Sequence, residues 1–142
     1  MAASVTEPLY TRAILRLAGS IPGQRTFSEM GDAAVFRSAT CGSRVAMRVT
    51  MDGDRVIGIE QAVEACAFGQ AAAALVGVGA IGMTRDEATL ALAGVERWLG
   101  GDVAEPWPGL DVLDPARARR GRHGAILLPF RALAAAIREA AR

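Results

Sequence analysis

The sequence predicts a single α+β domain over residues 1–142, in which a small three-stranded antiparallel sheet packs against several helices. Three observations lead to this fold class. Three β-like runs follow one another with short turns, the pattern changes from a two-residue to a helical period after Cys66, and no linker divides the chain. The length suits one domain with a buried core.

The first predicted element is a helix over residues 8–18. Ile14 and Leu17 fall near one face of this segment, as expected for a helix that covers a core. Thr6 is the expected N-cap, and Gly19 or Pro22 is the expected end of the helix. A loop then leads to the first strand.

Three β-like runs follow, at residues 33–38, 44–51 and 55–63. The second run alternates Val45, Met47 and Val49 with smaller or polar residues, which is the period of a sheet covered on one face. Asp52-Gly53 comes directly after it and is a strong hairpin signal. Three successive strands joined by short turns predict an antiparallel meander.

Two helices are predicted after the third strand. Residues 67–78 are small and apolar all round, which indicates a buried helix. Thr84 and Glu87 form a capping-box pattern, in which threonine and glutamate stand three residues apart. This pattern opens a second helix, which is expected to end at Leu99 before two glycines.

Two more helices are predicted toward the C-terminus. Asp114-Pro115 suits the start of a short helix that runs to Arg120, because proline is accepted in the first helical turn. Gly121 interrupts it, and the last helix is expected over about residues 123–142. Pro129 should then lie near its first turn, since an interior proline removes a helical hydrogen bond.

Composition excludes several classes of function. The 16 basic and 15 acidic residues nearly cancel, so no global field favours nucleic acid or an anionic membrane. The longest apolar run, residues 65–81, falls short of a membrane-spanning helix. No secretory leader is recognised, and two cysteines are too few for a disulfide framework. We therefore expect a soluble cytoplasmic protein.

No motif of an independent active site is present in the sequence. A serine elbow, a phosphate-binding loop and a pair of catalytic carboxylates are all missing. We therefore predict that the chain is not an enzyme.

The two cysteines are predicted to meet at one edge of the sheet. Cys41 lies in the loop between the first two strands, and Cys66 lies where the third strand gives way to the buried helix. A helix N-terminus stabilises a thiolate. With His123 at a predicted helix start, the three side chains form a soft metal site with one position open. The alternatives are inert buried cysteines, a capping histidine or a disulfide between Cys41 and Cys66.

Three segments of the chain resemble the U-type iron–sulfur scaffold family, the group of NifU N-terminal, IscU and SufU proteins. Residues 38–45, with the Asp-Gly-Asp of the following hairpin, look like its first ligand loop. Residues 64–74 are similar to its second ligand segment, in which a cysteine opens a helix of small residues. Residues 122–127 resemble the third, where the family has its last cysteine and the IscU branch has His-Cys. The match extends over most of the chain.

The ligand set departs from that of the family. Members that build clusters use three cysteines and an aspartate. Cys41 and Cys66 match two of the cysteines, and His123 matches the histidine of the IscU branch. Ser43 stands at the position of the aspartate, and Gly124 stands at that of the third cysteine. Two thiolates and one imidazole remain.

The resemblance implies a role in iron–sulfur cluster assembly together with a cysteine desulfurase and other assembly proteins. The first interpretation is a scaffold-like protein that binds iron, zinc or a labile cluster through Cys41, Cys66 and His123. Water, a partner's cysteine or a carboxylate such as Glu64 would complete the metal shell. The second is a metal-free module that docks to the desulfurase or to an assembly complex. The third is a sulfur acceptor that carries a persulfide on Cys41 or Cys66. The native metal and the oligomeric state are left open.

One cluster of charge remains, at Arg117, Arg119, Arg120 and Arg122. It has two interpretations: a docking patch for an acidic partner surface, or the solvated face of a short helix.

Overall fold

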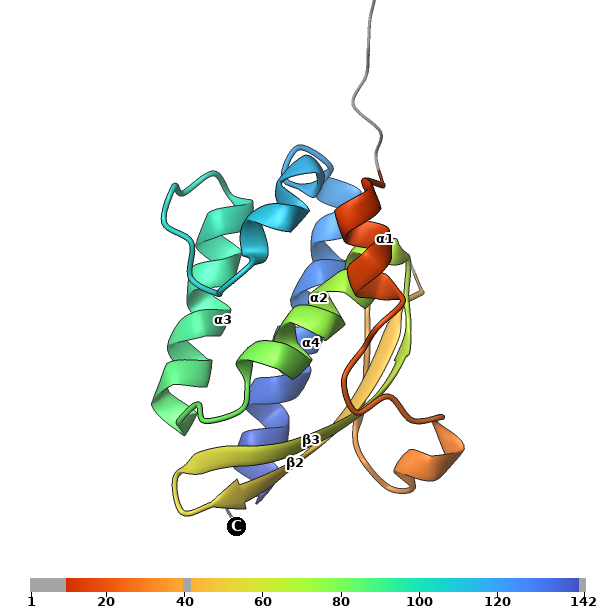
Figure 1. Cartoon of the computed structure of the whole chain (residues 1–142), viewed down its shortest axis with the longest axis vertical. Coiled ribbons are helices and arrows are strands. Elements are labelled where there is room, and N and C mark those ends of the chain that lie inside the picture. Colours follow the sequence, from red (N-terminus) through yellow and green to blue (C-terminus); the bar gives the residue numbers. More distant parts are fainter. Residues whose placement is uncertain (1–9, 40–41, 141–142) are drawn as a thin grey trace, which may run out of the picture.

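The computed structural model describes residues 10–39 and 42–140 of the chain. This part of the chain forms one sheet with four α-helices and two short 3-10 helices, in agreement with the predicted α+β class (Figure 1). Its elements are α1 (Arg12–Ala18), η1 (Ser28–Met30), β1 (Val35–Arg37), β2 (Arg44–Asp52), β3 (Arg55–Glu64), α2 (Ala67–Gly79), α3 (Arg85–Leu99), η2 (Leu110–Ala116) and α4 (Arg120–Ala140).

The sheet is the predicted antiparallel meander, with β2 between β1 and β3. β2 and β3 are joined by a tight turn, in which Asp52 pairs with Arg55. Gly53 in this turn has a positive φ of 59°, a conformation that glycine adopts without strain. The alternation of Val45, Met47 and Val49 places all three of these side chains in the core.

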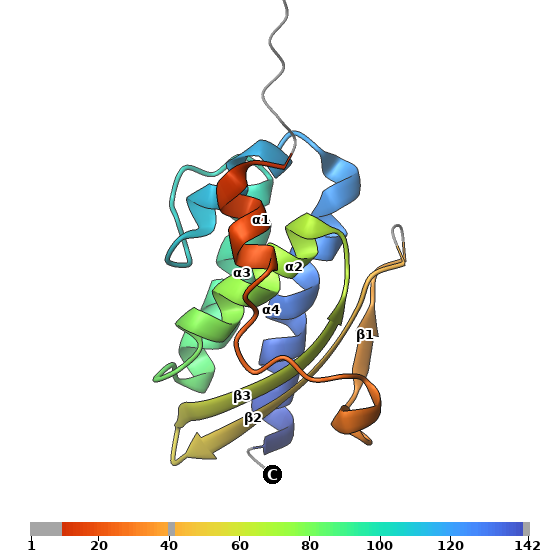
Figure 2. The same cartoon turned by 45° about the vertical axis from the view of Figure 1, so that its right-hand side comes forward.

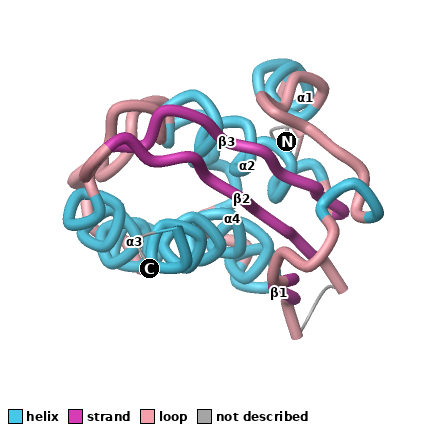
Figure 3. Tube along the Cα trace, turned by 90° about the horizontal axis from the view of Figure 1, so that it is seen from below, coloured by secondary structure: helices cyan, strands magenta, loops and turns pink. Residues whose placement is uncertain are grey.

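Helix α4 is the centre of the packing, because it contacts β2, α2 and α3. β2 and β3 run diagonally across the molecule with α4 beside β2 (Figure 3). Helix α2 is buried along most of its length, and the alanines at positions 71–74 allow it to lie close to α4. Within the described residues, none of the helices combines the length and the apolar character that crossing a bilayer requires.

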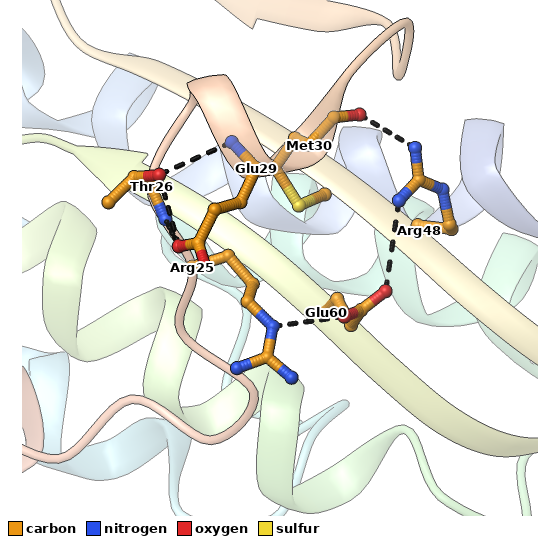
Figure 4. A network of polar contacts seen from close by, with 6 residues as sticks. All are labelled: Arg25, Thr26, Glu29, Met30, Arg48 and Glu60. Carbon is orange, nitrogen blue, oxygen red and sulfur yellow. Dashed lines mark hydrogen bonds and ion pairs between the residues drawn. The ribbon is translucent and has the colours of Figure 1, made fainter.

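A network of polar contacts holds the η1 segment over the outer side of the sheet (Figure 4). Glu60 accepts a hydrogen bond from Arg25 Nε at 3.0 Å and lies 3.8 Å from Arg48 Nη1. Arg48 Nη2 also donates to the carbonyl oxygen of Met30. These contacts fix the chain from Arg25 to Met30 against β2 and β3.

The helix ends show which local signals decide the structure. The capping box is confirmed: Thr84 Oγ1 accepts from Glu87 N, and the carboxylate of Glu87 accepts from Thr84 N. The expected cap at Thr6 is wrong. Helix α1 begins at Arg12 because Thr11 Oγ1 accepts from Ile14 N at 3.2 Å, and Thr6 itself lies outside the described residues.

The last helix begins earlier than predicted, and proline does not mark its start. Helix α4 includes Gly121, and Pro129 lies in its interior. Pro129 cannot donate to the carbonyl of Ala125, four residues before it, but it is buried, and packing along the helix outweighs the missing bond. The short helix is also different, since η2 begins at Leu110 instead of Asp114 and contains Pro115.

Candidate functional site

The strand register brings the two cysteine-bearing segments to one end of the sheet. Arg44 in β2 pairs with Arg37 in β1 and with Glu64 in β3. The loop of residues 38–43 and the start of α2 therefore leave the sheet at the same end, as predicted. The base of the loop is closed by a hydrogen bond from Ser38 N to the carbonyl oxygen of Ser43 at 2.9 Å. Cys41 lies outside the described residues.

Cys66 is the N-cap residue of α2, in an extended conformation with φ −65° and ψ 171°. Its thiol makes no capping hydrogen bond and is free of any disulfide, and the residue is partly buried against the core. A sulfur at this position lies beside the free backbone N–H groups of the first turn of α2. The sequence therefore predicted the placement of Cys66 correctly.

Helices α2 and α4 meet closely at this same end (Figure 2). A Cβ atom built on Gly69, in the first turn of α2, would lie 3.2 Å from the carbonyl oxygen of Ala125 and 3.3 Å from its Cβ. Only glycine fits such a contact without a shift. The first turn of α2, which follows Cys66, is therefore held directly against the early part of α4.

His123 lies one turn into α4, and its ring is hydrogen-bonded to the backbone. The Nε2 atom lies 2.8 Å from the carbonyl oxygen of Arg117. A carbonyl oxygen can only accept, so Nε2 is the donor in this hydrogen bond, and Nδ1 is the ring nitrogen that remains for a metal. The ring borders a cavity of about 650 Å³ between the end of α3, η2 and α4, whose lining does not include Cys66.

Glu64, the candidate carboxylate ligand, forms an ion pair with Arg44. Its two oxygens accept from Arg44 Nε at 2.8 Å and Arg44 Nη2 at 2.9 Å. This hydrogen bonding holds the pKa of Glu64 below its ordinary value and raises that of Arg44. The Arg44 guanidinium also stacks 3.8 Å from the ring centroid of Phe27. Glu64 is thus committed to an ion pair that sequence reasoning missed.

Within residues 10–39 and 42–140, no three histidine, cysteine or acidic side chains gather closely enough to hold a metal ion. Cys41 lies outside this range, so the predicted set of Cys41, Cys66 and His123 remains a prediction. Ser43, at the family's aspartate position, is buried and 3% exposed. Gly124, at the position of the third cysteine, supplies no donor.

Comparison with solved structures identifies the fold. A nitrogen-fixing NifU-like protein (N-terminal) from Brucella abortus is 31% identical to this chain, with a TM-score of 0.82 and 94% of each chain covered. The chain belongs to this NifU-like family. The similarity confirms the resemblance that residues 38–45, 64–74 and 122–127 indicated from the sequence. Members of this family are scaffold proteins rather than catalysts, which agrees with the prediction for this chain.

Two further structures show how widely this NifU-like fold is shared. One is FiSufU from thermophilic Fervidobacterium islandicum AW-1, assigned as an iron–sulfur cluster assembly scaffold protein for the SUF system. It is 23% identical, with a TM-score of 0.73 over 91% of this chain and 96% of its own. A hypothetical protein is 21% identical, with a TM-score of 0.72 over 92% and 97%. No family model matches the chain, and neither does any curated protein sequence.

Proposed function

We propose that this NifU-like protein takes part in cytoplasmic iron–sulfur cluster assembly and holds iron, zinc or a labile cluster as cargo at the end of its sheet. Cys66, Cys41 and His123 would supply the protein's donors. The observation that carries the proposal is the thiol of Cys66. It lies at the N-terminus of α2, makes no capping bond and belongs to a fold shared with a NifU-like protein.

The chemistry of the donors suits a cargo that is held weakly. Thiolate sulfur and imidazole nitrogen are good ligands for zinc and iron. Three donors leave a fourth position for water or a partner's cysteine, whereas Glu64 is withdrawn by its ion pair with Arg44. A site that is one ligand short binds less tightly than four thiolates, so its cargo can pass on when a partner completes the shell. A cysteine desulfurase and other assembly proteins are the expected partners.

A second candidate function is a metal-free module that docks to the desulfurase or to an assembly complex. The residues at two ligand positions favour it, because Ser43 and Gly124 replace a carboxylate and a thiolate. The fold alone would then carry the function, through its surface.

Metal analysis separates the two candidates. The protein would be purified without oxygen or chelator, and its iron and zinc would be measured by elemental analysis, alongside Cys66→Ser, Cys41→Ser and His123→Ala. Thr89→Ser on the exposed side of α3 serves as the control. The cargo proposal predicts metal in the parent and the control and a large loss in Cys66→Ser.

Circular dichroism shows whether each variant is folded. If the folded parent holds no metal and forms no cluster on anaerobic reconstitution, the cargo proposal is wrong, and the docking module is the better account. If Cys66→Ser keeps all of the metal, the site lies elsewhere in the chain.

A further inference from the structure

The four arginines at the start of α4 divide into two kinds. Arg117 is bound within the protein: its Nε donates to the carbonyl of Trp98 at 3.0 Å, and its Nη2 donates to that of Asp102 at 2.6 Å. Its Nη1 lies 3.3 Å from Asp114 Oδ1, and its guanidinium lies 4.5 Å from the Trp98 ring centroid. Arg117 therefore fastens the end of α3 to η2.

The other three, Arg119, Arg120 and Arg122, form a surface that we call the α4 arginine surface. Their side chains make no hydrogen bond or ion pair to the described part of the chain, and Arg119 and Arg120 are exposed. Two acidic groups of the neighbouring segments already face other arginines, since Asp114 pairs with Arg117 and Asp102 lies 3.8 Å from Arg97. None of the three guanidinium groups is therefore paired with a carboxylate of the described residues.

Their position makes these charges unfavourable for the isolated protein. The N-terminus of a helix carries a partial positive charge, so acidic residues stabilise it and basic residues do not. Helix α3 follows this rule, with Asp86 and Glu87 in its first turn. Helix α4, with 21 residues, has no acidic residue in its first turn and begins among arginines. A local rule broken at one place is expected where function requires it.

We propose that the α4 arginine surface docks an acidic segment, a run of glutamates or aspartates, of a protein partner. Guanidinium groups pair with carboxylates through two parallel hydrogen bonds, which gives both affinity and orientation. The cavity of about 650 Å³ beside Arg120, bordered by Gly100 and Gly101, provides room for a side chain of such a segment. Gly100 and Gly101 have no side chains that would block the entry to this cavity.

The charge of the whole chain indicates a protein partner rather than a nucleic acid. Nucleic acids bind through many phosphate contacts spread over a basic face. Here the formal net charge is only +1, and the excess of positive charge is local. Three neighbouring arginines are enough to pair with the carboxylates of one short acidic segment.

The α4 arginine surface lies at the end of α4 from which Ala125 packs against the first turn of α2, and Arg120 lines the same cavity as His123. A partner that docks there would lie next to His123, one of the proposed donors. A role of this partner in cargo exchange rests on the proposed function. The proposal that the docked segment is acidic does not depend on that function.

The test measures binding of a fluorescein-labelled oligoglutamate peptide of about ten residues by fluorescence anisotropy at low salt. The parent should bind, and the variant Arg119→Glu/Arg120→Glu/Arg122→Glu should bind at least about tenfold more weakly. Added salt should weaken the parent complex, since exposed charges are screened.

A matched control changes the charge by the same amount at three other exposed arginines, as Arg85→Glu/Arg131→Glu/Arg138→Glu. This control should lose no more than about threefold, through its altered net charge alone. Equal losses in both variants would overturn the proposal, because only the overall charge would then matter. Tighter binding of a single-stranded oligonucleotide than of the peptide, through the same arginines, would also overturn it.

Folding and metal content are controlled separately. Glutamates at a helix N-terminus favour the helix, so the reversed variant should unfold at no lower temperature than the parent. If it does unfold, the triple change to glutamine should weaken binding in the same direction. The parent and Cys66→Ser, both metal-free, should bind the peptide equally, so the docking result stands whether or not metal binds to the protein.

Discussion

The close approach of α2 to α4 can be tested with one methyl group. In Gly69→Ala, the new Cβ would lie 2.7 Å from the Cβ of Ala65 and 3.2 Å from the carbonyl oxygen of Ala125. The first distance is shorter than carbon atoms tolerate, so the backbone around Ala65 or the start of α2 has to shift. Gly121→Ala, in the first turn of α4, is the matched control, because its Cβ would meet nothing within 4 Å.

The two variants share a gain in helix propensity but differ in packing. Replacing a helical glycine with alanine stabilises by up to about 1 kcal/mol. Overpacking a filled interior costs about 1–3 kcal/mol. Gly69→Ala should therefore lower the free energy of unfolding by about 1–2 kcal/mol, whereas Gly121→Ala should raise it by up to about 1 kcal/mol.

Urea denaturation followed by far-UV circular dichroism measures both values. A second measurement is the bound metal, which Gly69→Ala should reduce because it displaces the turn that carries Cys66. If Gly69→Ala is as stable as Gly121→Ala, then α2 and α4 can separate at little cost. The contact of Gly69 with α4 would then not be what positions Cys66.

Three more changes test other parts of the structure. Gly124→Cys restores the third cysteine position of the family and should raise bound iron or zinc per chain; unchanged metal content would mean that a thiol there does not reach the site. Glu87→Gln removes the charge of the α3 capping box, where hydrogen bonds from Thr84 lower the pKa of Glu87 below its ordinary value of 4.5. The stability that this carboxylate provides is fully present at pH values above 4.5, its ordinary pKa. It is lost as the pH falls through the lower pKa that Glu87 has in the folded protein. The parent should therefore exceed the variant at neutral pH, and the gap should close in acid; a gap constant with pH would contradict this. Trp107→Phe removes the donor to the carbonyl of Leu75 at 2.9 Å and leaves a void in the core, so the unfolding free energy should fall by about 2 kcal/mol; an unchanged value would contradict the contact.

The parts of the fold that the sequence predicts well are those set by local chemistry. The turn at Asp52-Gly53 and the capping box at Thr84 each depend on a few neighbouring residues, and both are confirmed. The start of α4 does not depend on such signals. Gly121 and Pro129 are poor helix residues, and α4 continues through both because its neighbours bury its apolar side, which a local pattern does not reveal.

The site was predictable only up to the position of its elements. A meander necessarily brings the loop after β1 and the end of β3 to one edge, so the placement of Cys66 followed from topology. The ion pair between Arg44 and Glu64 could have been found by aligning the strands from the Asp52-Gly53 turn, which sets these residues opposite each other. The contact of His123 with the Arg117 carbonyl depends on the end of η2, for which the sequence gives no signal.

The missing ligands and the α4 arginine surface change the local charge in the same direction, toward positive. Serine at position 43 and glycine at position 124 remove a carboxylate and a thiolate, both negative, from the end of the sheet. The start of α4 carries three arginines whose side chains have no ion-pair partner among the described residues, and Glu64, at the end of β3, is bound by Arg44. Both changes leave this end of the protein short of negative charge. An acidic partner would supply that charge, and a cysteine or carboxylate from the partner would also complete the metal shell. The docking of one acidic partner would then restore both the charge balance and the metal ligands. The loss of the ligands and the presence of the three arginines would thus have the same cause.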